Sequence, residues 1–144
     1  MKSARVLIVD DHEIFRKGLR SLLESREDLQ ICGEAGDGLE AIEKAKDLRP
    51  DVVLMDISLP HMDGLQATRL IRGQVPETHI LILSQHDSSL MLSAALKAGA
   101  SAYVTKSQVS QSLIAALESL IGGPPPRWNL NGPPNGTPSQ QDTT

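Results

Sequence analysis

Asp56 stands near the end of a short apolar run and is the residue around which chemistry can be built in this chain. Residues 51–60 read DVVLMDISLP. Apolar runs of this length with β-branched residues are typical of strands buried on both faces of a parallel sheet. A carboxylate at the end of such a strand is unfavourable unless solvent, a metal ion or an opposite charge meets it. Because ligands of open α/β sheets bind at the carboxyl ends of the strands, Asp56 is a candidate reactive group.

Other reactive side chains follow other apolar runs in the same way. They are Asp10 and Asp11 after residues 5–9, Ser84 at the end of residues 79–84, and Lys106 after residues 102–105. The carboxyl ends of parallel strands lie on one edge of a sheet, so we expect these groups to converge. Clustered carboxylates repel one another, and oxygen ligands favour a hard cation such as Mg²⁺. An ammonium beside a bound cation suits a phosphoryl group, and an aspartate can itself form an acyl phosphate.

The elements that must position these groups alternate along the chain. We expect five strands, at residues 5–9, 29–35, 51–56, 79–84 and 102–105. Each is followed by a segment with helical apolar spacing. Caps are expected at Asp11, Asp37, Asp63 and Asp87–Ser89, and stops near Pro50, Pro76, Gly99 and Gly122. Strictly alternating strands and helices predict an α/β fold, a parallel sheet covered by helices on both faces.

Composition limits the class of protein. The 144 residues carry a formal net charge of −4, which gives no basic footprint for nucleic acid across the chain. Cys32 is the single cysteine, which excludes an internal disulfide and fits a reducing compartment. Residues 6–9 are too short for a signal-peptide core or a membrane span. We therefore expect a soluble cytoplasmic protein with one domain, residues 1–123, followed by a Pro- and Gly-rich disordered tail or truncated linker, residues 124–144.

The ordered set of motifs resembles the receiver domain of response regulators, the phospho-accepting half of two-component signalling. The resemblance covers about residues 4–123. It rests on Asp10-Asp11, Asp56, residues 59–64, Ser84, Gly99-Ala100, Tyr103 and Lys106. The segments around Ser84, Tyr103 and Lys106 are most similar to the NarL/FixJ branch. The resemblance implies a flavodoxin-like (βα)5 doubly wound fold with a five-stranded parallel sheet in the order 2-1-3-4-5.

The resemblance also implies a role for each site residue. Asp56 would accept a phosphoryl group from the phosphohistidine of a histidine kinase or phosphotransfer protein. Mg²⁺ would be held by Asp10, Asp11, Asp56 and the backbone carbonyl of Ser58. Lys106 would pair with the phosphoryl oxygens, and Ser84 and Tyr103 would act as the switch. The chain would then be a phosphoacceptor that assists its own phosphorylation and dephosphorylation, and not an enzyme in the usual sense.

The expected output is a change in protein contact. The NarL/FixJ branch continues into a helix-turn-helix domain, and no recognition helix follows the last expected helix here. From this and the net charge we expect a downstream protein partner or a homodimer, with no direct DNA binding by this chain and no membrane partner.

Other functions fit the sequence less well. A phosphatase of the haloacid-dehalogenase type needs an acid two residues after the nucleophile, where this chain has Ser58. A flavin binder of this fold needs a glycine- and hydroxyl-rich loop after the first strand, where Asp10 and Asp11 stand. A binding module that does not switch keeps the fold but leaves Asp56 and Lys106 without a purpose. The histidines nearest the acidic edge share no ligand-like spacing and are interpreted as solvated loop residues: His12, His61 and His86.

Overall fold

A computed structural model describes residues 3–85 and 88–121 of the chain. In that part, strands and helices alternate as the sequence predicts. They are β1 Ala4–Val9, α1 Glu13–Glu24, β2 Leu29–Ala35, α2 Gly38–Leu48, β3 Val52–Asp56, α3 Gly64–Gln74, β4 His79–Ser84, α4 Ser89–Ala98, β5 Ala102–Thr105, the 3-10 turn η1 Lys106–Gln108, and α5 Val109–Ile121. The expected tail, residues 124–144, lies outside the described residues. None of the described helices has the length and apolar character needed to cross a membrane.

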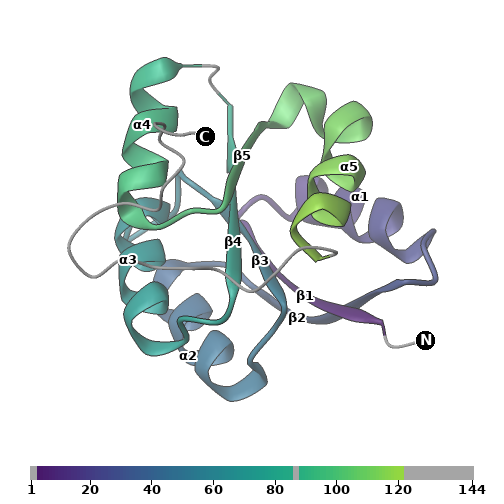
Figure 1. Cartoon of the computed structure of the whole chain (residues 1–144), viewed down its shortest axis with the longest axis horizontal. Coiled ribbons are helices and arrows are strands. Elements are labelled where there is room, and N and C mark those ends of the chain that lie inside the picture. Colours follow the sequence, from purple (N-terminus) through teal and green to yellow (C-terminus); the bar gives the residue numbers. More distant parts are fainter. Residues whose placement is uncertain (1–2, 86–87, 122–144) are drawn as a thin grey trace, which may run out of the picture.

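The strands form one parallel sheet in the order β2-β1-β3-β4-β5. This confirms the predicted flavodoxin-like topology and places β2 at one edge of the sheet. Helices α2, α3 and α4 lie on one face, and α1 and α5 lie on the other (Figure 1). The central strand of this order is β3, so both faces of the strand that carries Asp56 are covered by helices.

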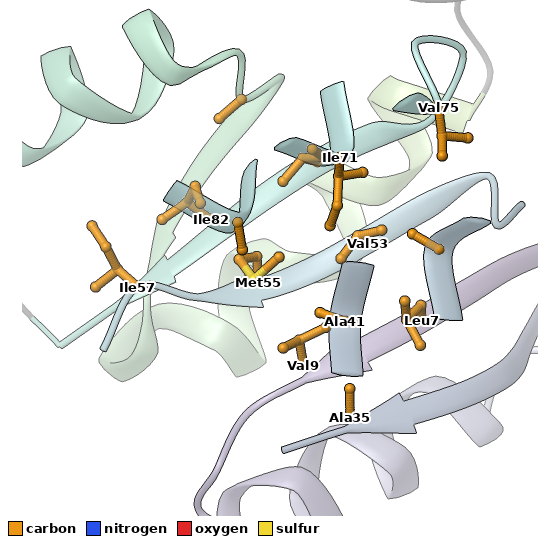
Figure 2. Close-up of a cluster of buried hydrophobic side chains, with 14 of the residues drawn as sticks. Leu7, Val9, Ala35, Ala41, Val53, Met55, Ile57, Ile71, Val75 and Ile82 are labelled. Carbon is orange, nitrogen blue, oxygen red and sulfur yellow. The ribbon is translucent and has the colours of Figure 1, made fainter. Parts of the chain in front are cut away.

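The core follows from the two-residue period of the strands, whose side chains alternate between the two faces. Leu7, Val53 and Ile82 point toward the helices α2, α3 and α4, where they meet Ala41 and Ile71 (Figure 2). Residues one position along the same strands pack against α1 and α5 instead; they are Val6, Ile8, Val52, Leu54, Leu81 and Leu83. Buried side chains therefore pack against both faces of the sheet, and this packing fixes the positions of the strand ends at its carboxyl edge.

Side-chain caps start three of the helices. The carboxylate of Asp37 accepts a hydrogen bond from the backbone N–H of Glu40 at 2.8 Å, and that of Asp63 accepts one from Gln66 at 2.8 Å. The hydroxyl of Ser88 accepts one from the N–H of Met91 at 3.3 Å.

The prediction that Asp11 caps α1 is wrong. The cap residue is His12, and its side chain makes no capping hydrogen bond. The N–H of His12 instead donates to the Asp10 carboxylate at 2.7 Å. The turn before α1 therefore fixes the side chain of Asp10, and the Asp11 carboxylate has no capping role.

Strand register brings the predicted reactive positions together. Val9 pairs with Met55, so Asp10, the next residue, comes level with Asp56. Asp56 in turn pairs with Leu83, one residue before Ser84. Thr105 pairs with Ser84, and Lys106 follows it directly. The four strand ends therefore meet at one edge, as the sequence predicts for parallel strands.

Gly64 lets α3 start directly against the end of β3. A Cβ atom at this position would lie 2.2 Å from the carbonyl oxygen of Asp56 and 2.8 Å from the Cα of Ile57. Both are backbone atoms of the strand end that presents the Asp56 carboxylate. The backbone N–H of Gly64 also donates to the Ile57 carbonyl at 2.9 Å. A side chain here would have to push α3 away from the site.

Arg72 ties the end of α3 to two other segments. Its guanidinium donates to the carbonyl of Gly99 at 3.1 and 3.3 Å, to that of Pro76 at 2.8 Å, and to that of Thr78 at 2.5 Å. Gly99 ends α4 in the left-handed conformation, with φ of 110°, as the expected glycine stop. One half-buried side chain therefore joins the ends of α3 and α4 to the start of β4.

We predict that Gly64→Ala destabilises the fold by about 2 kcal/mol or more, because the added methyl group meets backbone atoms that have no room to move. Gly73→Ala in the same helix is the matched control. No atom lies within 4 Å of a Cβ at that position, so the change should stabilise the helix by about 0.5–1 kcal/mol. Urea unfolding of the three proteins measures both effects, and equal midpoints would contradict the close approach.

Candidate functional site

Four side chains at the carboxyl edge of the sheet form an acidic pocket. They are Asp10, Asp11, His12 and Asp56, and one ligand atom from each lies within 4.8 Å of the others. Asp10 and Asp56 are buried, with exposed fractions of 0% and 1%, whereas Asp11 and His12 line the open side. Residues that are far apart in sequence and close to strand ends thus present three carboxylates and one imidazole to a common point.

Lys106 provides the positive charge of the site. Its Nζ lies 2.9 Å from Asp10 Oδ2 and 3.3 Å from Asp56 Oδ2. The ammonium also lies over the ring of Phe15, 4.4 Å from the centroid, where the ring attracts a cation. With an exposed side-chain fraction of 10%, Lys106 is held from three sides and points at both buried acids.

The Asp56 carboxylate is poorly stabilised in its charged form. Burial raises its pKa, and the nearby charge of Asp10 raises it further. Two contacts act in the opposite direction: the backbone N–H of Ser58 donates to Oδ1 at 3.1 Å, and Lys106 faces Oδ2. The raised pKa means that these two contacts do not offset burial and repulsion.

Asp10 is fixed from the side of α1. Its Oδ1 accepts the backbone N–H of His12, and its main-chain carbonyl accepts the guanidinium of Arg16 at 2.5 Å. Arg16 is held in turn by Glu34 of β2, with Nε 3.0 Å from Oε1. These contacts lock the strand end that carries Asp10, so the carboxylate cannot turn away from Asp56.

The remaining predicted site residues are Ser84, Tyr103 and Ser58. Ser84 is buried at the end of β4, and Tyr103 of β5 is partly buried against the core on the side of α2, α3 and α4. Ser58 is exposed and directly follows the strand end. Their assigned roles as switch residues and as a carbonyl ligand stay predictions.

The sequence interpretation missed two members of the site. His12 was treated as a solvated loop histidine, but its Nδ1 lies 3.2 Å from both Asp10 Oδ1 and Asp11 Oδ1. Phe15 was assigned only to the apolar face of α1. Its place one helical turn beyond Asp11 was the available signal. His61 is exposed in the loop after β3 and does not belong to the acidic cluster, and His86 lies outside the described residues.

The donor set fits a divalent cation. Three carboxylates face one ammonium, which leaves two negative charges without compensation. Among the residues that the structure describes, the buried Asp10 Oδ2 and Asp56 Oδ2 share one cationic partner, the Lys106 ammonium, at 2.9 and 3.3 Å. Buried carboxylate oxygens of this kind require a cation or a donor. Asp10, Asp11 and Asp56 are therefore the residues that could hold a metal ion.

Comparison with protein families identifies the fold and its general class. The family model described as the response regulator receiver domain matches residues 6–118. The chain is 40% identical over 119 residues to the transcriptional regulatory protein LnrK of Bacillus subtilis, covering 83% of this chain and 54% of that protein. This relative is named as a transcriptional regulator.

Solved structures give the same result. A two-component response regulator of the LuxR family from Aurantimonas sp. SI85-9A1 superimposes with a TM-score of 0.80 at 42% identity, covering 84% of this chain and 87% of that one. The receiver domain of the response regulator NarL from Mycobacterium tuberculosis gives a TM-score of 0.78 at 34% identity, covering 85% and 100%. These similarities confirm the predicted NarL-like branch.

The expectation of no direct DNA binding is contradicted by the relatives of this chain. LnrK is named as a transcriptional regulator, and the chain spans about half the length of the curated relatives it matches, 54% of LnrK. The net charge and the helix pattern of this chain describe only the receiver, so they carry no information about DNA binding by a longer protein.

The matched family model spans most of the described chain, the strand order is that of a receiver, and relatives of 34–42% identity carry the same fold. The chain therefore belongs to the response regulator receiver domain family.

Proposed function

We propose that this chain is the receiver of a two-component system in which Asp56 accepts a phosphoryl group from a histidine kinase. The observation that carries the proposal is the convergence of two buried carboxylates, those of Asp10 and Asp56, on the single ammonium of Lys106. A structural ion pair would need only one acid. Two acids that share one ammonium leave room for a cation and for an anionic group beside it.

The proposed chemistry uses the residues already in place. An oxygen of the Asp56 carboxylate attacks the phosphorus, the bond from phosphorus to the donor's histidine nitrogen breaks, and an acyl phosphate forms on Asp56. Lys106 then pairs with a phosphoryl oxygen, and the Ser84 hydroxyl donates to another. Asp10, Asp11, Asp56 and the carbonyl of Ser58 would hold Mg²⁺, which when bound supplies positive charge to the phosphoryl oxygens.

The proposed output is transcriptional. LnrK is named as a transcriptional regulatory protein, and this chain matches about half of the length of LnrK. We infer that this receiver controls a DNA-binding regulator in the cytoplasm, with Ser84 and Tyr103 passing the phosphorylation state to the surface near β5. The receiver is assigned to residues 1–123, and the family model match to residues 6–118 supports that boundary.

Phosphorylation by acetyl phosphate tests the site. With Mg²⁺ present, the wild type should gain one phosphoryl group in intact-protein mass spectrometry, and Asp56→Asn should gain none. Asp51→Asn is the matched control, because Asp51 precedes the same strand at its other end and only accepts a hydrogen bond from the Arg5 N–H at 2.8 Å. Full incorporation in Asp56→Asn would reject Asp56 as the acceptor.

Lys106→Ala should slow incorporation by about 10²-fold, because the ammonium is the group that meets the developing charge on the phosphoryl oxygens. Mg²⁺ should still bind, since the three carboxylates remain. Initial rates measured with acetyl phosphate, together with calorimetric Mg²⁺ titration of the same variant, separate the two effects. An unchanged rate would remove Lys106 from the chemistry.

Asp56→Asn should stabilise the metal-free fold at neutral pH. The pKa of Asp56 is raised above its ordinary value of 3.8, so the folded state binds the proton more tightly than the unfolded state. Stability is therefore fully present below pH 3.8 and is lost as the pH rises through the folded pKa. Removing the charge should raise the melting temperature at pH 7 by roughly 4 °C for each ~1 kcal/mol of relieved repulsion.

Melting curves in EDTA from pH 4 to pH 8 provide the measurement. The gap between Asp56→Asn and wild type should open as the pH rises. Asp63→Asn, a change of an exposed helix cap, is the control, and its offset from wild type should stay constant across that range. A variant less stable than wild type at pH 7 would mean that Lys106 outweighs the repulsion.

A further inference from the structure

Phe15 is the aromatic neighbour of the Lys106 ammonium. The centroid of its ring lies 4.4 Å from Lys106 Nζ, within the range in which a ring face attracts a cation. The same ammonium lies 2.9 Å from Asp10 Oδ2 and 3.3 Å from Asp56 Oδ2. The Lys106 side chain is 10% exposed, so these partners leave little of it in contact with water.

Packing against the core fixes the ring of Phe15. Phe15 stands in the first turn of α1 and packs, half-buried, against the apolar cluster between the sheet and the helices α1 and α5. That cluster includes Val104 and Val109, which stand just before and just after the turn η1. Lys106 is the first residue of η1. The ring and the lysine therefore belong to one packed unit, although they come from opposite ends of the described chain.

A ring has an advantage over a further acid as a partner for this lysine. Four flexible methylenes carry the ammonium, and holding it in one place costs conformational entropy. In the proposed reaction the Asp56 carboxylate becomes an acyl phosphate, so its own attraction for the ammonium weakens. The attraction of the ring does not depend on that carboxylate. A third carboxylate in the same place would also hold the ammonium, but it would repel the incoming phosphoryl group.

We propose that Phe15 is a positioning residue for phosphoryl transfer, whose ring keeps the Lys106 ammonium beside Asp56 while the acyl phosphate forms. The ring acts through Lys106 and supplies no group to the bond that forms or to the bond that breaks. The inference rests on the proposed function, and it adds the residue that holds Lys106 in place during the reaction.

Fluorination of the ring tests this inference without changing its packing. The chain has one phenylalanine, so fluorinated phenylalanine supplied during expression replaces Phe15 alone. Fluorine withdraws electron density from the ring face and weakens its attraction for a cation, while the shape of the ring is nearly kept. With acetyl phosphate and Mg²⁺, the initial rate of phosphorylation should fall stepwise from one to three fluorine atoms, by about fivefold in total. In Lys106→Ala the same series should leave the rate constant, because no ammonium faces the ring.

Substitutions of Phe15 provide a second readout. Phe15→Leu keeps an apolar side chain but removes the ring, and it should slow phosphorylation by about fivefold. Phe15→Tyr keeps an aromatic face and should restore most of the rate. Leu22→Ala is the matched control, since Leu22 of the same helix is half-buried against the same apolar cluster. Its truncation should lower the melting temperature and leave the rate of phosphorylation unchanged.

The fluorine NMR signal of the singly fluorinated protein, recorded without metal, tests the contact itself. The signal should move when Lys106→Ala removes the ammonium, and an unmoved signal would overturn the inference. Equal rates across the fluorinated series, or an equal fall in Lys106→Ala, would also overturn it while the proposed function stands. If Asp56→Asn is still phosphorylated or Lys106→Ala reacts as fast as wild type, the proposed function fails, and the role of Phe15 fails with it.

Discussion

Repulsion between two buried carboxylates is the constraint on which the rest of this structure depends. Asp10 and Asp56 lie side by side at the ends of adjacent strands, and one ammonium, that of Lys106, serves both. Such a pair is stable only when neighbouring elements prevent each acid from turning away. The first turn of α1 holds Asp10, the N–H of Ser58 holds Asp56, and Phe15 holds Lys106. The helices thus keep two repelling carboxylates close together, a repulsion that a bound cation would relieve.

The sheet and most of the site could be predicted because their signals are local. Apolar runs mark the strands, and a parallel arrangement brings their carboxyl ends to one edge, which predicts that Asp10, Asp56 and Lys106 meet. The cap of α1 could not be read in this way. Asp11 looks like a cap in sequence, but the N–H of His12 is taken by Asp10, so the carboxylate of Asp11 stays with the acidic pocket. Competition between two neighbouring acids for one N–H has no signature in sequence.

The directions of the His12 and Phe15 side chains were the second feature that could not be predicted from the sequence. Phe15 and His12 are ordinary residues of a helix start, and only the twist of the chain between β1 and α1 turns both rings toward the strand ends.

The prediction about DNA failed for a different reason. Charge and helix pattern within a receiver report on the receiver, while relatives such as LnrK are about twice as long as the matched segment.

Arg72 sets the mechanical freedom of α4. Its guanidinium binds the carbonyl of Gly99 at the C-terminal end of that helix and two carbonyls at the approach to β4. The opposite end, at Ser88, has no comparable attachment to the sheet among the contacts that the structure describes, and the exposed side chains of Leu90 and Leu92 add little packing there. The C-terminal end of α4 is thus fixed by polar contacts of one side chain, whereas its first turn is held by the Ser88 cap and by the packing of Met91 on the core.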